Sequence, residues 1–580
     1  MNARVRAVLF AVIVLTVAVD PLSAQKKSVS AGKKSASSAL QSSPVLQAMK
    51  DELTHSLDAL KGQSTPPYFL SYEIGESNNI SIVGSFGTIT RSNESRRRLM
   101  NIDLRVGDFK VDNTRALRGS GQSFDFADRF SFIEIPIEDD PAAIRTTLWY
   151  HTDQKYKRAV EQLTKVKTNM QVQVEQEDKS ADFSQEPPET YTEKLQALAL
   201  DRHTWEEKIR KYTAPFARYG DIYEANAVLS ASAETRWFVS NEGSQIQTSQ
   251  TYYRLFISAF TKADDGMELP RYESFFAFTP EGLPDDAAIL KAVDKMIQDL
   301  RALRTAPVVE PYTGPAILSG RASGVFFHEV FGHRIEGHRQ KRVEEGQTFK
   351  KMVNDKVLPD SFSVVFDPTL YRLGNQDLVG AYRYDDEGVK ARRLSVVENG
   401  VFKNFLMSRT PIDGFPGSNG HGRNQAGFAP VARQSNLIVQ ASSPVTRAEL
   451  KKMLLEQIQK ENKPFGLLFD DIQGGFTITT RTIPNAFNVL PVMVYRIYPD
   501  GKEELVRGVD LIGTPLTTFS KILAADDQVG VFNGVCGAES GWVPVSAVSP
   551  GILLSQIEVQ KKSMSQERPP LLPAPFAVEK

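Results

Sequence analysis

The sequence predicts an α+β protein of two domains, an α/β N-terminal domain built on an antiparallel sheet and a β-rich C-terminal domain that carries a histidine-rich helix. A chain of 580 residues is longer than a single hydrophobic core usually supports, so more than one domain is expected. Short runs of alternating apolar residues recur in both halves of the chain. Pro307, Pro311 and Pro315 follow each other closely and mark a boundary near residue 307. We therefore expect domains at 44–306 and 307–580.

The first residues are typical of a secretory signal peptide. Arg4 and Arg6 precede an apolar run from Ala7 to Val19, and small residues up to Ala24 suit a cleavage site. We expect cleavage near Ala24, which removes residues 1–24 and leaves an exported protein, periplasmic or secreted. Residues 25–43 are rich in Lys, Ser and Ala and predict a flexible linker.

Helices and strands then alternate through the N-terminal domain. Apolar residues at helical spacing predict one helix from Pro44 and another after Asp285. Asp285 and Asp286 stand at the start of the second helix, where negative charge is favourable. Residues 67–136 and 223–278 read as strands. Between them, at about 141–200, we expect an insertion with a long, charged and solvated helix, or alternatively an arm that binds a partner.

Two turns predict hairpins in the C-terminal domain. Asn399-Gly400 stands between apolar runs, which is the strongest short hairpin signal. Residues Pro499 to Gly501 separate two further strand-like runs. This half is therefore strand-rich, and the histidine helix interrupts it.

Charge and cysteine content narrow the classes of function. A formal net charge of -1 argues against a dominant role in binding nucleic acid and leaves small molecules, peptides or proteins as partners. Cys536 is the only cysteine, so no internal disulfide can form. It is either a small buried apolar side chain or a thiolate with a function.

Three of the seven histidines fall within the stretch GVFFHEVFGHRIEGHRQ, residues 324–340. His328 and His333 are five residues apart, which on a regular α-helix separates side chains by about 140°. They can converge on a metal only if the helix widens in a π-bulge or ends near Gly332. Apolar neighbours would bury both imidazoles, and burying unpaired polar rings is costly, which favours a metal site over packed histidines.

A catalytic metal site needs a third ligand and a base. Glu329 is the candidate general base, and Cys536, His338 and Glu336 are rival third ligands. Gly534 and Gly537 flank Cys536 and permit a close approach of its backbone.

An acidic run, Asp385, Asp386 and Glu387, follows Tyr384. It could orient a ligand histidine or hold the amino terminus of a peptide, and the alternative is a solvated turn closed by Gly388. Several glycines between 414 and 427, Gly422 among them, could let a substrate backbone lie close or mark only a mobile loop.

Four blocks in this order resemble one family, the TldD/PmbA metallopeptidases. They are the H-E-x-x-x-H string that runs on to Gly337, the segment from Tyr384 to Leu406, the glycine-rich segment from Gly417 to Val439, and the terminal CGAESGWVPVS. Together they span about residues 310–560 and look like the TldD branch, which keeps the metal ligands.

The resemblance implies a metallopeptidase with its metal on His328, His333 and Cys536 and with Glu329 as general base. Zinc, one ion per chain, suits this ligand set best, and another divalent metal is the alternative. The family similarly implies a dimer around the active site, either a homodimer or a heterodimer with a related PmbA-like subunit that lacks the ligands. Tyr384, Asp385, Asp386, Glu387, Gly422 and His338 are the further candidates for substrate binding or for support of the ligands.

The chain departs from the family pattern in three respects. The branch is typically cytoplasmic, the charged segment at about 154–189 is longer than expected, and His338 stands where an acidic residue is common. The predicted function is hydrolysis of unstructured peptides or unfolded proteins. The alternatives are a secreted, metal-stabilised binding or assembly module without peptidase activity, and a metal-dependent hydrolase of non-peptide amides.

Overall fold

A computed structural model describes residues 43–117, 132–171, 178–342, 344–480, 487–562, 567–572 and 574–575. The expected signal peptide and all of the linker except Ser43 lie outside the described residues. All of the described ranges belong to one compact unit, 42–580. Among the described residues, no helix combines the length and the apolarity needed to cross a membrane.

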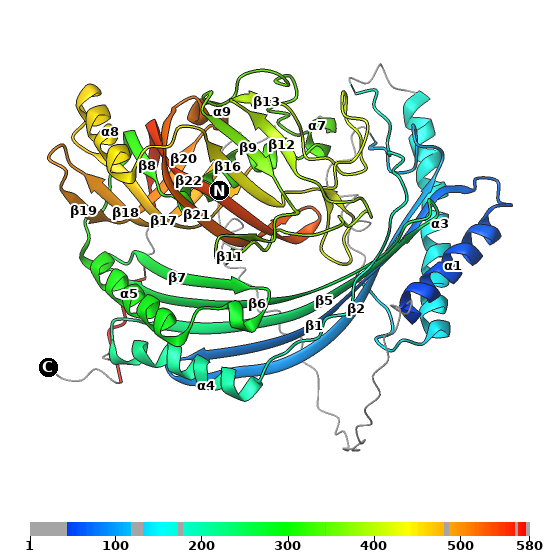
Figure 1. Ribbon diagram of the computed structural model, residues 1–580, viewed down its shortest axis with the longest axis horizontal. Helices are drawn as coiled ribbons and strands as arrows, with labels where there is room; N and C mark the ends of the chain where they lie inside the picture. The colour runs from blue at the N-terminus through cyan, green and yellow to red at the C-terminus, as the bar shows by residue number, and fades with distance from the viewer. Residues whose placement is uncertain are drawn as a thin grey trace. The chain divides into compact units, whose positions relative to one another are not determined.

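An antiparallel sheet dominates the first half of the described chain (Figure 1). Its strands run in the order β3-β2-β1-β5-β6-β4, with β7 on β6, and only the short β4 pairs in parallel. The bounds are β1 Pro67–Ser85, β2 Thr88–Val106, β3 Ile133–Glu134, β4 Thr190–Thr192, β5 Glu224–Ser240, β6 Gln245–Lys262 and β7 Glu268–Ala277. The antiparallel sheet expected from alternating residues is confirmed.

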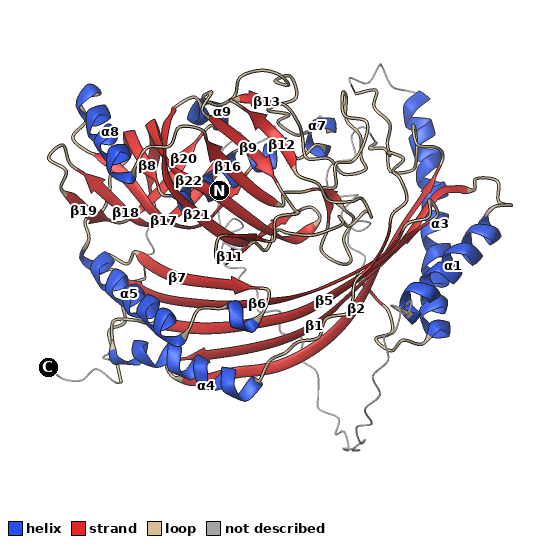
Figure 2. Cartoon of the chain, viewed as in Figure 1, coloured by secondary structure: helices blue, strands red, loops and turns tan. Residues whose placement is uncertain are grey.

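Helices pack against this sheet, as Figure 2 shows in blue. They are α1 Pro44–Leu60, α3 Pro141–Gln171, α4 Arg202–Thr213 and α5 Asp286–Thr305, with short 3-10 turns η1 Ala214–Arg218 and η2 Pro280–Gly282. Both predicted amphipathic helices are confirmed. α1 begins with Pro44 in its first turn, and Asp285 caps α5 by accepting from the N–H of Ala288 at 2.8 Å.

The predicted solvated helix needs a correction. α3 begins earlier than the charged stretch suggests, and it buries a stripe that includes Ile144, Leu148 and Leu163 against α1 and β2. These residues recur at helical spacing but stand far apart among charged neighbours, so the stripe is hard to see in the sequence. The segment after the helix also contacts the rest of the protein, because the N–H of Ser184 donates to the carbonyl of Arg409 at 2.9 Å.

The second sheet has eleven strands in the order β13-β12-β9-β16-β22-β20-β18-β17-β8, with β19 on β18 and β21 on β22. Because β8 also pairs with β22, five strands close into a ring. The bounds are β8 Tyr312–Leu318, β9 Phe362–Phe366, β12 Leu394–Glu398, β13 Val401–Phe402, β16 Asn436–Ala441, β17 Gly466–Thr477, β18 Phe487–Ile497, β19 Glu503–Val506, β20 Val509–Gly513, β21 Ile522–Ala538 and β22 Gly541–Lys561. The β-rich C-terminal half is confirmed.

Short elements complete this half. The helices are α6 Gly320–Val330, η3 Gly332–Ile335, α7 His338–Lys341, α8 Arg447–Lys460 and α9 Pro515–Phe519, and the two-residue strands are β10 Arg372–Leu373, β11 Gln376–Asp377, β14 Gly422–Arg423 and β15 Val431–Ala432. α6 is buried along its length, and Phe326, Phe327 and Phe331 join the main hydrophobic core. The core therefore fixes the helix that carries His328.

Both predicted hairpins are confirmed. Asn399 and Gly400 have φ of 47° and 80° and connect β12 to β13 by a two-residue turn. β18 and β19 pair in antiparallel fashion across the second turn.

Hydrogen bonds join the two sheets close to α6. Arg271 of β7 donates to Asp471 of β17 at 2.7 Å, and the Tyr272 hydroxyl donates to the carbonyl of Ile472 at 2.6 Å. Arg321 of α6 contacts the same Asp471 carboxylate at 2.9 Å. The division at residue 307 falls between α5 and β8, and it stays a prediction of separate domains.

The buried stripe of α3 predicts a large loss of stability for Leu148→Ala. Leu148 is fully buried, so truncation should cost about 2–5 kcal/mol of unfolding free energy. Urea denaturation measures the loss, and Lys167→Ala, on the exposed side of the same helix, is the control. Equal stability of the two variants would mean that α3 is solvated on all sides.

Candidate metal centre

The helix α6 ends between the two histidines. His328 and Glu329 lie in its last turn, the N–H of Phe331 makes the final bond to Phe327 at 3.0 Å, and a 3-10 turn begins at Gly332. Of the two geometries that allow convergence, the structure shows the helix end near Gly332 rather than a π-bulge. The turn after the break brings His333 back toward His328.

Two side chains, one nearby in the chain and one distant, hold this helix end. The last carbonyls of an α-helix lack partners within the helix. Gln434 donates to the carbonyl of His328 at 3.2 Å, and Arg334 donates to the carbonyls of Glu329 at 2.9 Å and Val330 at 3.2 Å. A Cβ at Gly332 would lie 2.0 Å from Oε1 of Gln434, so only glycine fits beside this cap.

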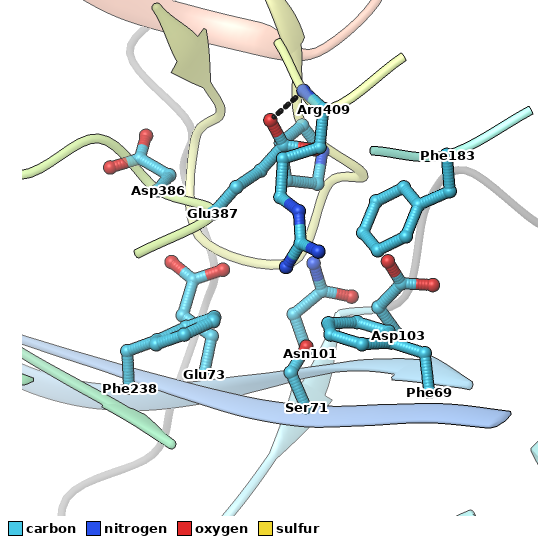
Figure 3. A pocket seen from close by; sticks show the side chains of 11 residues that line it. Phe69, Ser71, Glu73, Asn101, Asp103, Phe183, Phe238, Asp386, Glu387 and Arg409 are labelled. Carbon is cyan, nitrogen blue, oxygen red and sulfur yellow. Dashed lines mark hydrogen bonds between the residues drawn. The ribbon is translucent and has the colours of Figure 1, made fainter. Parts of the chain in front are cut away.

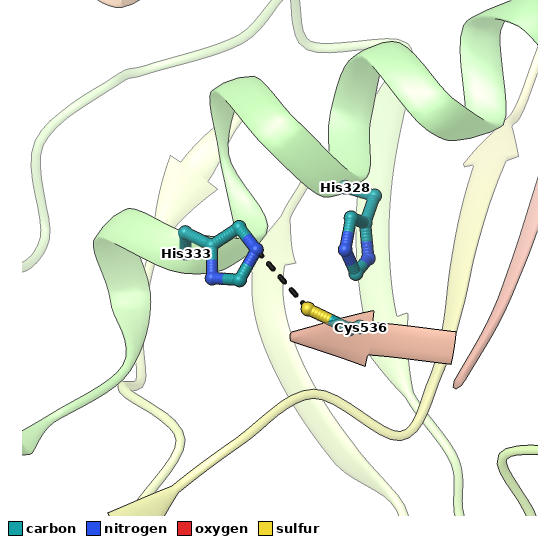
Figure 4. A group of neighbouring side chains, drawn as sticks. All are labelled: His328, His333 and Cys536. Atoms are coloured by element: carbon teal, nitrogen blue, oxygen red, sulfur yellow. Dashed lines mark hydrogen bonds between the residues drawn. The ribbon is translucent and has the colours of Figure 1, made fainter. Parts of the chain in front are cut away.

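The structure brings His328, His333 and Cys536 together (Figure 4). One donor atom from each lies within 4.8 Å of the others, and Cys536 Sγ is 3.2 Å from Nε2 of His333. Their exposed fractions are 8%, 6% and 6%. Cys536 comes from β21, more than two hundred residues beyond the helix. Two imidazoles and a thiol, buried and convergent, are a donor set that fits zinc.

Glu336, a rival ligand, contacts the opposite nitrogen of the ring. Its Oε2 lies 3.2 Å from Nδ1 of His333 and accepts from Nε of Arg339 at 2.8 Å. Burial would raise the pKa of Glu336, but His333 and Arg339 lower it to about 2. A carboxylate on Nδ1 orients the imidazole and leaves Nε2 for a metal.

Arg433 connects the histidine segment to the cysteine strand. Its Nη2 donates to the carbonyl of Cys536 at 2.7 Å, and its Nε lies 3.5 Å from Glu336. The side chain is fully buried. Nothing in the spacing of the sequence pairs it with either element.

His338, the other rival ligand, lies outside the group of three donors. It pairs with Glu539, which also accepts from Nη2 of Arg339 at 2.8 Å. Burial lowers the pKa of His338 and favours its neutral form. His338 and Glu539 thus extend the charged network around the donors.

The charges in the site favour a thiolate. Burial alone would raise the pKa of Cys536, but His333, Arg433 and His328 lower it well below its ordinary value. Conversely, burial would lower the pKa of His333, while Cys536 and Glu336 raise it well above 6.5. A thiolate is the form that binds metals.

Glu329 lies beside the three donors. Its Oε2 is 4.0 Å from Nε2 of His333. Burial raises the pKa of its carboxyl group. A Cβ at Gly475 of β17 would lie 2.8 Å from Cγ of Glu329, so the glycine makes room for this side chain.

The acidic run and Tyr384 before it have partners away from the histidines, most of them on distant segments of the chain. Asp385 accepts from the N–H groups of Val389 and Gly422 at 2.8 and 2.9 Å. The Tyr384 hydroxyl donates to Glu189 at 3.2 Å. Among the described residues, none of these bonds reaches His328 or His333. The proposed role of the run in orienting a ligand histidine therefore has no support in these contacts.

Asp386 and Glu387 instead line a small pocket between the first sheet and the glycine-rich segment (Figure 3). Asp386 pairs with Arg236 of β5 and accepts from the N–H of Asn424 at 2.7 Å. Glu387 accepts from the N–H of Arg409 at 2.7 Å. A Cβ at Gly422 would lie 2.0 Å from Glu387, so Gly422 serves this packing.

A buried group of two histidines and one cysteine beside a carboxylate is an arrangement found in catalytic metal sites. Residues 311–561 match the PmbA/TldA metallopeptidase C-terminal domain. This C-terminal region is therefore a domain of the TldD/PmbA family.

Curated relatives bear metalloprotease names. A metalloprotease of Archaeoglobus fulgidus is 31% identical over 41% of this chain and 51% of its own length. One from Methanocaldococcus jannaschii is 24% identical over 62% of this chain and 72% of its own length. A zinc metalloprotease TldD homolog of Saccharolobus solfataricus is 24% identical over 42% of this chain and 51% of its own. The match thus spans about half the length of two of these three relatives.

Solved structures share the fold. TldE from Thermococcus kodakarensis has a TM-score of 0.57 at 13% identity and covers 88% of this chain and 100% of its own. A Thermotoga maritima protein described as a modulator of DNA gyrase also has a TM-score of 0.57, at 16% identity, and covers 88% and 99% of the two chains. At such identities the likeness concerns the fold.

The buried acidic pair predicts pH-dependent stability. Burial raises the pKa of both Asp385 and Glu387, so the folded state holds protons that the unfolded state releases as pH rises. Stability should therefore be greatest below the ordinary carboxyl pKa and fall toward pH 8. Glu387→Gln should raise Tm by a few degrees at pH 8 and much less at pH 5.

Thermal unfolding at both pH values measures this difference. Glu398→Gln, at an exposed carboxylate, is the control and should leave Tm unchanged. An equal shift of Tm at pH 5 and pH 8 for Glu387→Gln would contradict the linkage.

Proposed function

We propose that this chain is a metallopeptidase that hydrolyses peptide bonds of unstructured peptides or unfolded proteins. The observation that carries the proposal is the buried group of His328, His333 and Cys536, with donor atoms within 4.8 Å, beside Glu329. The metalloprotease names of its relatives support the same class.

His328, His333 and Cys536 would hold one zinc ion, and another divalent metal is the alternative. When bound, such an ion supplies Lewis-acid chemistry, which lowers the pKa of water and polarises a carbonyl. Three protein donors leave a position for water or substrate, as in catalytic zinc sites. Glu336 keeps His333 in the required orientation through Nδ1.

Glu329 would act as the general base. Its carboxylate accepts a proton from the attacking water and returns it to the nitrogen of the leaving amine, while the C–N bond breaks. Its raised pKa suits this exchange, because a base works best near the ambient pH. Burial keeps the group out of bulk water.

An edge strand would hold the substrate. β21 carries Cys536 and pairs only with β22 between Val529 and Ala538, in the part of the chain that the structure describes. An extended peptide can add to such an edge through backbone bonds, which gives weak sequence preference. This arrangement favours unstructured peptides over folded proteins.

The contacts of Glu336 and His338 weigh against the alternative of a metal-stabilised binding module. A structural zinc site has four protein ligands, and these two residues were the candidates for the fourth. Both have other partners, Arg339 and Glu539. A non-peptide amide as substrate would use the same residues and is distinguished by turnover assays.

Location and assembly are further proposals. We propose export with removal of residues 1–24, which N-terminal sequencing of protein from the native host checks by a start at Gln25. We also propose a dimer, either of two identical chains or with a PmbA-like subunit; the shared fold of TldE supports the second arrangement. Light scattering of the purified protein alone and with such a subunit distinguishes them.

Two variants should separate metal binding from catalysis. Cys536→Ala should lose zinc and peptide cleavage together, because it removes a buried ligand. Glu329→Gln should keep about one zinc per chain and lose cleavage by about 10²–10⁴-fold, the usual contribution of a general base. Elemental analysis and turnover of an unstructured peptide pool measure both quantities.

His203→Ala, an exposed histidine on α4, is the control and should match the wild type in metal content and in rate. Full activity of Glu329→Gln would remove Glu329 from the proposed role. A full zinc complement in Cys536→Ala would remove the cysteine from the ligand set.

A further inference from the structure

Alternate residues of β21 near Cys536 direct their backbone N–H and C=O groups away from the partner strand β22. Asn533 pairs with Ser546, whose N–H donates to the carbonyl of Ser435, just before β16, at 3.2 Å rather than to β21. Four pairs further along, the N–H of Trp542 donates to Gln425 instead of to Gly537. Because the pattern alternates, Asn533, Val535 and Gly537 direct their N–H and C=O groups away from β22.

Arg254 closes this edge at one point. It lies on β6 of the first sheet, and its Nη1 donates to the carbonyl of Asn533 at 2.8 Å. That carbonyl is one of the outward groups, so a peptide paired with Val535 and Gly537 cannot continue past Asn533. Asn533 and Cys536 are three residues apart, which is about 10 Å along a strand.

The positive charge of Arg254 has no carboxylate partner among the described residues. Its other contacts are the Ser274 hydroxyl, at 2.9 Å, and the Phe276 ring, 5.5 Å from the guanidinium carbon. By contrast, Arg236 on neighbouring β5 contacts both Glu73 and Asp386. Burial lowers the pKa of Arg254 to about 10, which leaves it charged at neutral pH.

A guanidinium has five N–H donors in a planar fork that matches a carboxylate. Among the described residues, the hydrogen bonds of Arg254 all use Nη1, so Nη2 and Nε remain for a bidentate pair. A half-buried cation without a counter-ion, at the closed end of a backbone edge, is suited to binding the carboxylate of an incoming peptide.

We propose that Arg254 is a specificity-determining residue that binds a carboxylate of the peptide substrate, and that the closed edge makes this the terminal carboxylate. The inference rests on the proposed peptidase function. A peptide with its carboxyl end at Asn533 runs antiparallel to β21. Hydrolysis beside Cys536 then adds water across the amide and releases a fragment of about three residues from the carboxyl terminus.

Binding to a Glu329→Gln protein loaded with zinc tests this inference without turnover. Isothermal titration compares three forms of one unstructured peptide: the free acid, the carboxyl-terminal amide, and the amide with Glu as its last residue. We expect the free acid to bind about 10-fold or more tightly than the amide, because charge-assisted hydrogen bonds are lost with the carboxylate. Arg254→Gln should abolish this difference, and Arg254→Lys should restore part of it.

Arg96→Gln is the matched control, because the exposed guanidinium of Arg96 already pairs with Glu76. This variant should keep the preference for the free acid over the amide. Tight binding of the amide that ends in Glu would identify a side-chain carboxylate as the group that Arg254 binds. Two results would overturn the inference. One is equal binding of all three peptides to the Glu329→Gln protein in which Arg254 is unchanged, and the other is equal weakening of all three by the added Arg254→Gln substitution. Failure of the wild type to cleave any peptide would instead overturn the proposed function.

Discussion

The end of α6 at Gly332 is the constraint on which the site depends. Had the helix continued, His328 and His333 would point about 140° apart and could not share a metal. The break leaves carbonyls without helical partners, and Gln434 and Arg334 supply the missing donors. Because a Cβ at Gly332 would collide with Gln434, the glycine and the cap are required together.

A charged network then fixes the donors against each other. Glu336 contacts His333, and Arg433 contacts both Glu336 and the carbonyl of Cys536. Burying an unpaired charge is costly. Carboxylates and guanidinium groups alternate in this network, and this alternation permits a charged thiolate in the interior. The same network joins a helix and a strand that lie about two hundred residues apart in the chain.

Local signals predicted much of the fold. Helical periodicity predicted α1 and α5, and Asn399-Gly400 predicted a two-residue turn. The spacing of His328 and His333 predicted that a helix able to bind a metal through both must widen or end. Long-range contacts were not predictable in this way. Gln434 and Arg433 carry no spacing signal toward the histidines, the stripe of α3 is hidden among charged residues, and the partners of the acidic run come from distant segments. Cys536 was one of three candidate ligands by sequence, and only its pairing with β22 brings it to the helix.

The ligand set is the central claim, and X-ray absorption at the zinc edge of the zinc-loaded protein tests it most directly. Two histidine nitrogens and one cysteine sulfur predict one scatterer at about 2.3 Å, typical of sulfur, and two at about 2.0–2.1 Å, typical of imidazole. A spectrum without sulfur, or one that shows four protein ligands and no position for water, would contradict the account.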